Sequence, residues 1–289
     1  MNSQPVIGVF FSGRTIKCGK VKNGKIEKAV TQRINNKASE EEVLAQVIEI
    51  IESVFDDEVT GIGIGVPSVV DVEKGIVYEV KNIPSWIEVH IKDILENHFD
   101  VKVYVNNDAN CFTVGEKYFG VAKDYENIVG LILSTGVGAG VIFKGHLYWG
   151  TNCGAGEFGY LPFKDFDFEY YCSEKFFEKK FGLSAELVYQ RALQNDKIAL
   201  AIYEQYGENI GHLLKAIMYA VDPEIIVIGG NSAKAFEFYK KEMYRVLRTF
   251  QFRHAVERLK IVPSQHPDIA VLGAAALFYD AQNILVKKF

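Results

Sequence analysis

The chain has 289 residues, 48% of them hydrophobic, which is enough for one large or two ordinary domains with a sizeable core. Its formal net charge of −5, with mixed signs, argues against partners such as nucleic acid or a membrane surface. The four cysteines lack metal-ligand spacing, so we expect reduced thiols. No apolar run approaches the roughly 20 residues of a membrane span, so we expect a cytoplasmic protein.

The first elements predict a strand, a turn, a second strand and a hairpin. Residues 5–11 and 16–21 are typical of strands, and Asn23-Gly24 is a hairpin signal. The same pattern returns from Gly130, with Lys144-Gly145 as the later hairpin. A chance match is the alternative, but the two hairpins favour a duplicated α/β architecture.

Helices and short strands then alternate. Ser39 and Glu42 form a capping box that opens a helix to about residue 55, and the glycine-rich strand 61–66 indicates close backbone approach. A strand at 76–80 and a helix at 89–99 follow. The loop between them is either fixed by a buried Trp86 or offers Asn82 to a ligand, and the sequence leaves both readings open.

A run of polar residues follows the next predicted strand, 101–105, and precedes a helix over 109–119. Asp108 therefore lies where a strand passes into a helix, the place where open α/β sheets bind ligands. Asn107 or Asp108 could instead only cap the helix. Four Asn or Asp residues occur in the five positions 106–110, and one would suffice for a cap, so we favour a functional role.

The strand 128–133 leads into a glycine-rich string, residues 134–140, whose backbone amides and hydroxyls suit an anion such as phosphate. The string lacks the Lys-Ser/Thr ending of a P-loop and opens a strand rather than a helix, which excludes the P-loop and dinucleotide motifs. A tight hairpin that needs positive φ is the alternative.

The rest of the chain continues the α/β pattern. Glu157 is the single carboxylate of a second glycine-rich loop. We expect helices from Ser184 and over 198–221, a buried strand at 225–228 that ends in Gly229-Gly230, and a helix from Ser232 to about residue 250. A strand at 259–262 and an apolar helix at 270–279 complete the pattern.

Six motifs resemble the ROK (repressor, ORF, kinase) family of glucokinase-like sugar kinases, in the actin-like ATPase superfamily. They read GIGVPSVVD (63–71), NIPSW (82–86), NNDAN (106–110), STGVGAG (134–140), GAGEFGY (154–160) and IVIGG (226–230). The resemblance implies a two-domain actin/hexokinase-like (ribonuclease H-like) fold with duplicated mixed sheets and an interdomain cleft. We expect an N-terminal domain over 1–119, completed by a C-terminal helix at 275–289, and a larger nucleotide-binding domain over 120–274.

The resemblance also implies roles for individual residues. Asp108 would be the general base that takes a proton from the sugar hydroxyl. The expected sugar-binding residues are Asn82, Asn107, Glu157, Tyr160 and Glu174. The expected ATP-binding residues are Ser12, Arg14, Thr135, Gly136, Gly138, Gly229 and Gly230.

Two departures from the family pattern bear on metals. Phe10 stands where the family has a magnesium-associated aspartate, and a phenyl ring offers no oxygen ligand, so Mg²⁺ would need a non-standard site. Tyr160 replaces a zinc-binding histidine and the cysteine-rich loop is shortened, so we expect no structural zinc. Cys172 is then a remnant that acts as a small hydrophobic residue.

These observations predict an ATP-dependent kinase of a free hexose or N-acetylhexosamine, with the family's homodimeric assembly. The alternative is a catalytically impaired sugar-binding or regulatory protein, which Phe10 and Tyr160 favour. A DNA-binding repressor is less favoured, because the chain starts directly at the first strand without a helix-turn-helix.

Overall fold

The computed structural model describes residues 4–12, 15–80 and 82–287, without the side chains of residue 12 and residues 283–287. The chain divides into two compact units. The first contains Met1–Asp124, Gly140–Ala155 and Gln265–Phe289, and the second contains Tyr125–Ala139 and Gly156–Ser264.

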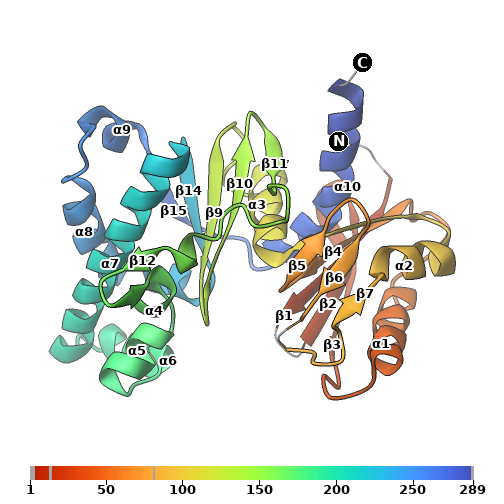
Figure 1. Ribbon diagram of the computed structural model, residues 1–289, viewed down its shortest axis with the longest axis horizontal. Helices are drawn as coiled ribbons and strands as arrows, with labels where there is room; N and C mark the ends of the chain where they lie inside the picture. The colour runs from red at the N-terminus through yellow and green to blue at the C-terminus, as the bar shows by residue number, and fades with distance from the viewer. Residues whose placement is uncertain (1–3, 13–14, 81, 288–289) are drawn as a thin grey trace. The chain divides into compact units, whose positions relative to one another are not determined.

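The first unit is built on a five-stranded mixed sheet of order β3-β2-β1-β4-β8 (Figure 1). Its strands are β1 (Val6–Ser12), β2 (Thr15–Lys22), β3 (Lys25–Arg33), β4 (Gly61–Val66) and β8 (Lys102–Asn107). The pairs β1–β2 and β2–β3 are antiparallel, whereas β4 is parallel to both β1 and β8. Asn23 and Gly24, both at positive φ, form the predicted hairpin.

Four helices and a small sheet complete this unit. They are α1 (Glu40–Glu52), α2 (Ile91–Phe99), α3 (Asp108–Tyr118) and α10 (Ile269–Lys287), with β5 (Val69–Asp71), β6 (Ile76–Tyr78) and β7 (Glu88–Val89). The predicted capping box is present: the Ser39 hydroxyl accepts from the Glu42 amide, and the Glu42 carboxylate accepts from the Ser39 amide.

Glycines let helix α10 approach the backbone of the central strands, and Figure 1 shows that helix beside this sheet. A Cβ atom on Gly63 would lie 1.8 Å from the carbonyl oxygen of Ala274, and one on Gly8 would lie 2.1 Å from that of Val271. No side chain fits in either space, which confirms the close approach that the glycine-rich strand predicts.

The second five-stranded sheet repeats the topology of the first, in the order β11-β10-β9-β14-β15. Its strands are β9 (Ile128–Leu133), β10 (Val137–Phe143), β11 (His146–Tyr148), β14 (Ile225–Gly229) and β15 (Lys260–Pro263), and β10 passes from the second unit into the first. Strand β14 is parallel to β9 and β15. Lys144 and Gly145 have positive φ at the predicted second hairpin, so the predicted duplication is confirmed.

Helices and short segments make up the rest of the second unit. They are η1 (Phe158–Tyr160), β12 (Pro162–Phe163), β13 (Phe166–Asp167), α4 (Phe168–Cys172), α5 (Lys175–Phe181), α6 (Ala185–Leu193), α7 (Lys197–Val221), η2 (Asn231–Ala235), α8 (Phe236–Leu247) and α9 (Arg253–Arg258). The predicted helical segment is present, but Ser232 lies inside its first turn and does not cap it. A 3₁₀ turn comes first, and the buried Ser232 hydroxyl is bonded to that of Tyr206 instead of capping α8.

Within the described ranges, no helix combines the length and apolar character needed to cross a membrane. All four cysteines are buried free thiols. Burial raises the pKa of Cys18 to about 12 and raises that of Cys111 and Cys172 as well, so these thiols are protonated at neutral pH.

The glycine at position 63 provides a test of this packing. We expect Gly63→Ala to lower the free energy of unfolding by about 3 kcal/mol or more, because the added methyl group meets a helix carbonyl instead of a movable side chain. Gly154→Ala is the matched control, since a Cβ there has no atom within 4 Å. Urea unfolding followed by circular dichroism would contradict this account if both variants had the parent's midpoint.

Candidate functional site

The junction between β8 and α3 presents Asp108 as the first residue of the helix. Asn107 is the cap: its side-chain oxygen accepts from the Ala109 amide at 2.9 Å, and its amide group donates to the Ser68 carbonyl at 3.2 Å. Asp108 Oδ1 accepts from the same Ala109 amide at 2.9 Å, and the residue is half-buried. The positive end of α3 favours an ionised carboxylate at this position.

A buried amide holds this junction in shape. Asn106 Oδ1 lies 2.8 Å from the Asn107 nitrogen, 2.8 Å from Asn110 Nδ2 and 3.5 Å from the Cys153 sulfur. Asn106 and Asn110 are both almost fully buried. The polar run therefore has two functions: its buried members brace the backbone, and Asp108 remains at the edge of the sheet.

Phe10 lies on β1, in register with Gly65 of the neighbouring strand. A Cβ atom on Gly65 would be 3.1 Å from Phe10 Cδ2 and 2.9 Å from the sulfur of Cys111, which belongs to α3. The ring therefore lies beside Gly65, on the face of β4 that Cys111 of α3 also approaches. This position does not fit Mg²⁺, which needs oxygen ligands. Among the described side chains, no three of His, Cys, Asp and Glu gather as a metal-binding group.

Three other predicted residues belong to the first unit. Ser12 ends β1 opposite Thr15, with its side chain not described, and Arg14 lies outside the described residues. Asn82 is exposed, and its carbonyl accepts from Asn36 Nδ2 at 2.8 Å. Trp86 is buried, and its ring lies 5.6 Å from the Phe11 ring. This agrees with the first of the two alternatives, a loop fixed by a buried tryptophan.

The predicted phosphate turn, residues 134–138, connects β9 to β10 in the second unit. The Ser134 amide donates to the Gly136 carbonyl at 3.0 Å, and Thr135 is exposed at the tip. Neither Gly136 nor Gly138 has positive φ, so the alternative of a tight hairpin that needs such a φ does not explain these glycines. Gly140 has a packing role, because a Cβ there would be 2.3 Å from Thr113 Oγ1 on α3.

The Gly229 turn, residues 229–231, packs on the carbonyl that precedes the phosphate turn. Gly230 has φ 76° and ψ −170°, a conformation almost restricted to glycine, and a Cβ there would be 2.5 Å from the Leu133 carbonyl oxygen. The exposed backbone of Gly230 and its approach to β9 are compatible with a ligand at this strand end.

Glu174 links the two turns. Its carboxylate accepts from Asn231 Nδ2 at 2.6 Å and from the Ser134 hydroxyl at 3.4 Å, and its backbone amide donates to the Ser134 carbonyl at 2.8 Å. The sequence predicts that Glu174 binds sugar and predicts no role for Asn231. Only the position of Asn231, directly after the glycine pair, could have indicated it.

Glu157, Tyr160 and Cys172 have different environments. Glu157 is exposed at the start of η1, and Tyr160 is 56% exposed at its end. Cys172 is buried, and its carbonyl accepts from the Tyr206 hydroxyl at 2.7 Å. The protonated, enclosed thiol behaves as the small hydrophobic residue that the sequence predicts.

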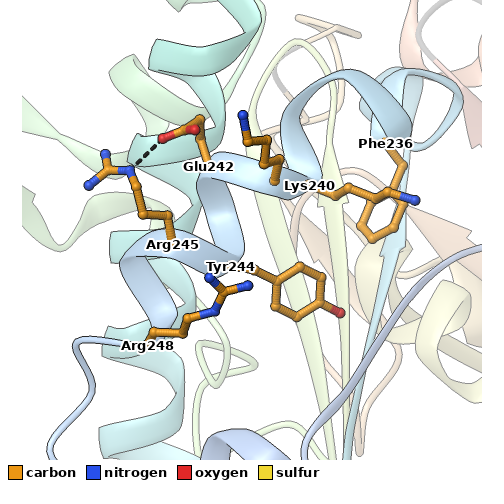
Figure 2. Close-up of a pocket in the computed structure, with 7 residues that line it drawn as sticks. Phe236, Lys240, Glu242, Tyr244, Arg245 and Arg248 are labelled. Carbon is orange, nitrogen blue, oxygen red and sulfur yellow. Dashed lines mark hydrogen bonds and ion pairs between the residues drawn. The ribbon is translucent and has the colours of Figure 1, made fainter.

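A separate pocket of about 480 Å³ lies on helix α8 (Figure 2). Its lining includes Lys240, Tyr244 and Arg248, with Arg245 paired to Glu242 at 2.5 Å. Its basic character would suit an anion. None of the predicted site residues lines this pocket.

Known proteins resemble this chain over most of its length. Glucokinase of Thermotoga maritima is 29% identical, over 94% of this chain and 96% of that protein. The xylose repressor of Bacillus subtilis is 28% identical, over 76% of this chain and 61% of the repressor. The solved structure of a ROK family glucokinase from Streptomyces griseus, in complex with glucose and AMPPNP, is similar with a TM-score of 0.79 at 22% sequence identity. The match covers 94% of this chain and 98% of that glucokinase.

The structural similarity establishes an actin/hexokinase-like fold, consistent with the two sheets of matching order. The ROK family model matches residues 6–281, which is nearly the whole chain. The protein therefore belongs to the ROK family.

Proposed function

We propose that the protein is an ATP-dependent kinase that phosphorylates a hydroxyl of a free hexose or N-acetylhexosamine, with Asp108 as general base. The observation that carries this proposal is the position of Asp108. It is half-buried at the carboxyl end of β8, where Asn107 already caps the helix and Asn106 braces the backbone. A cap alone does not require an additional carboxylate there.

The proposed reaction is an in-line phosphoryl transfer. The Asp108 carboxylate accepts the proton of the sugar hydroxyl, and that oxygen forms a bond to the γ-phosphorus of ATP. The bond between the γ-phosphorus and the bridging oxygen breaks, so that ADP leaves and a sugar phosphate forms. The proton on Asp108 then passes to water.

ATP binding is proposed at the phosphate turn and the Gly229 turn, with Thr135, Gly136, Gly138, Gly229 and Gly230 near the nucleotide. Glu174, which joins the two turns, supports a common site for them. Mg²⁺ bound with ATP would neutralise charge on the phosphates. Because the Phe10 ring offers this ion no oxygen ligand, we propose a non-standard magnesium site.

The sugar contacts remain part of the same proposal. Amide and carboxylate groups such as Asn82, Asn107 and Glu157 can bond several hydroxyls, and Tyr160 offers an exposed ring. Glu174 is also proposed to contact sugar. For this contact, its carboxylate must give up the hydrogen bonds from Ser134 and Asn231 and accept bonds from sugar hydroxyls instead. A cytoplasmic homodimer is the assembly we propose.

A second candidate is a sugar-binding or regulatory protein with impaired catalysis. The observation that favours it is Phe10, whose ring lies beside Gly65 at a position where the family resemblance expects a carboxylate. Similarity to a xylose repressor, together with similarity to a glucokinase, keeps this class of function open.

Asp108→Asn separates the two candidates. We expect sugar-dependent ADP release to fall by about 10² to 10⁴, because the amide cannot accept the proton. Sugar affinity should stay within about tenfold, since the amide keeps the size and most hydrogen bonds of the carboxylate. The measurement uses magnesium-ATP with glucose, fructose, mannose, N-acetylglucosamine and N-acetylmannosamine, and calorimetry for binding.

Asp100→Asn is the matched control, because Asp100 is an exposed carboxylate at the end of α2 in a left-handed conformation that asparagine also adopts. Equal turnover in Asp108→Asn and the parent would remove Asp108 from the mechanism. Binding of one sugar without turnover in the parent would favour the second candidate.

Phe10→Asp tests whether the missing carboxylate limits the rate. We expect turnover to rise by about tenfold or more, because a restored oxygen ligand can help to organise the metal at the phosphates. Phe10→Asn is the matched control for size and for relief of packing against Gly65. The same gain in both variants, or none in the aspartate variant while it stays folded, would argue against this role for Phe10.

A further inference from the structure

Two hydrogen-bond donors converge on one carboxylate at the phosphate turn. Glu169 Oε2 accepts from the Val137 amide at 3.4 Å, and Glu169 Oε1 accepts from the Lys175 ammonium at 2.5 Å. Glu169 comes from α4 and Lys175 from the start of α5. A Cβ atom on Gly136 would lie 3.0 Å from Oε2, so the carboxylate lies directly against the backbone of the turn.

The environment of this pair is partly enclosed. The Glu169 side chain is 16% exposed and that of Lys175 is 45% exposed. The hydrogen bond to Glu169 is the main cause of a raised Lys175 pKa, so the ammonium stays charged at neutral pH. Solvent therefore reaches the cation at the edge of the turn, whereas the carboxylate is more sheltered.

The chain around Lys175 is anchored to the turn. Glu174 donates its amide to the Ser134 carbonyl and bonds Asn231 through its carboxylate. The Lys175 amide donates to the hydroxyl of the buried Ser173 at 3.2 Å. Because the backbone is held directly before Lys175, an ammonium group here needs only side-chain motion to reach an anion at the turn.

Carboxylate and phosphate oxygens use the same donors, backbone amides and ammonium groups. Glu169 therefore marks an anion position that the turn already provides. The bond from Val137 is longer than the usual 2.7–3.2 Å range and should be the first to exchange. A phosphate carries more negative charge than a carboxylate and would compete strongly for both donors.

We propose that Lys175 is a phosphate-binding residue of the nucleotide site, and that the Glu169 carboxylate occupies the position of a phosphate oxygen until ATP displaces it. This inference rests on the proposed ATP site at the phosphate turn. Glu169 holds the ammonium beside the turn in the free protein, and displacement leaves Lys175 and the Val137 amide to bind the phosphate. No covalent step is involved.

The test measures the affinity of the full chain for ADP and for inorganic pyrophosphate by calorimetry. Glu169→Gln removes the competing charge and keeps the shape, so we expect about three- to tenfold tighter binding of both probes. Lys175→Met removes the cation and keeps the aliphatic stem, so we expect about five- to tenfold weaker binding. A structural role alone would not produce opposite signs.

Glu178→Gln and Lys180→Met are the matched controls, because both residues are exposed on α5 and Lys180 bonds Gln205 instead of the turn. Both should bind the probes within about twofold of the parent. In the double variant Glu169→Gln/Lys175→Met, the gain from the glutamine should shrink, since it depends on the released ammonium. Thermal unfolding verifies that each variant is folded.

The inference is overturned if the parent binds neither probe, if Glu169→Gln leaves affinity unchanged or weaker, or if Lys175→Met binds as the parent does. The kinase proposal fails separately, if no sugar supports turnover. Opposite affinity changes without turnover would retain the anion site and reject the kinase, and turnover without those changes would retain the kinase and reject this role of Lys175.

Discussion

Backbone contact through glycines is the constraint on which the first unit depends. Gly8 and Gly63 admit the carbonyls of α10 against the sheet, and a Cβ on Gly273 of α10 would lie 1.8 Å from the Cys111 carbonyl of α3. At these glycines, the backbones of the sheet, α10 and α3 therefore approach one another without an intervening side chain. Since backbone atoms cannot rotate away as side chains do, this packing holds the strand-to-helix junction in one position.

Much of the fold could be predicted because its signals are local. The capping box at Ser39 and the two hairpins involve residues next to one another in sequence, so their chemistry is visible without the fold. The bonding of Ser232, in the turn before α8, could not be predicted for the opposite reason. Ser232 is a favourable cap in isolation, but its hydroxyl bonds Tyr206, which is 26 positions away.

The candidate site shows the same limit. Asp108 could be proposed as a site residue because four polar residues interrupt an apolar pattern. Nothing in the sequence separates the bracing role of the buried Asn106 from the half-buried position of Asp108. The bonds from Glu174 to Ser134 and Asn231 span 40 and 57 positions. Such contacts depend on how helices and strands pack, and a single sequence does not contain that information.

The charges around the phosphate turn indicate how a protein cation could contribute to the proposed nucleotide site of the second unit. Phosphoryl transfer depends on stabilising negative charge, by metal or by protein cations. At an effective dielectric constant of about 20, two unit charges about 4 Å apart interact by about 4 kcal/mol. A lysine released by Glu169 would supply attraction of that order at the turn. Glu169, Lys175 and the turn all belong to the second unit, so this attraction arises within one compact unit.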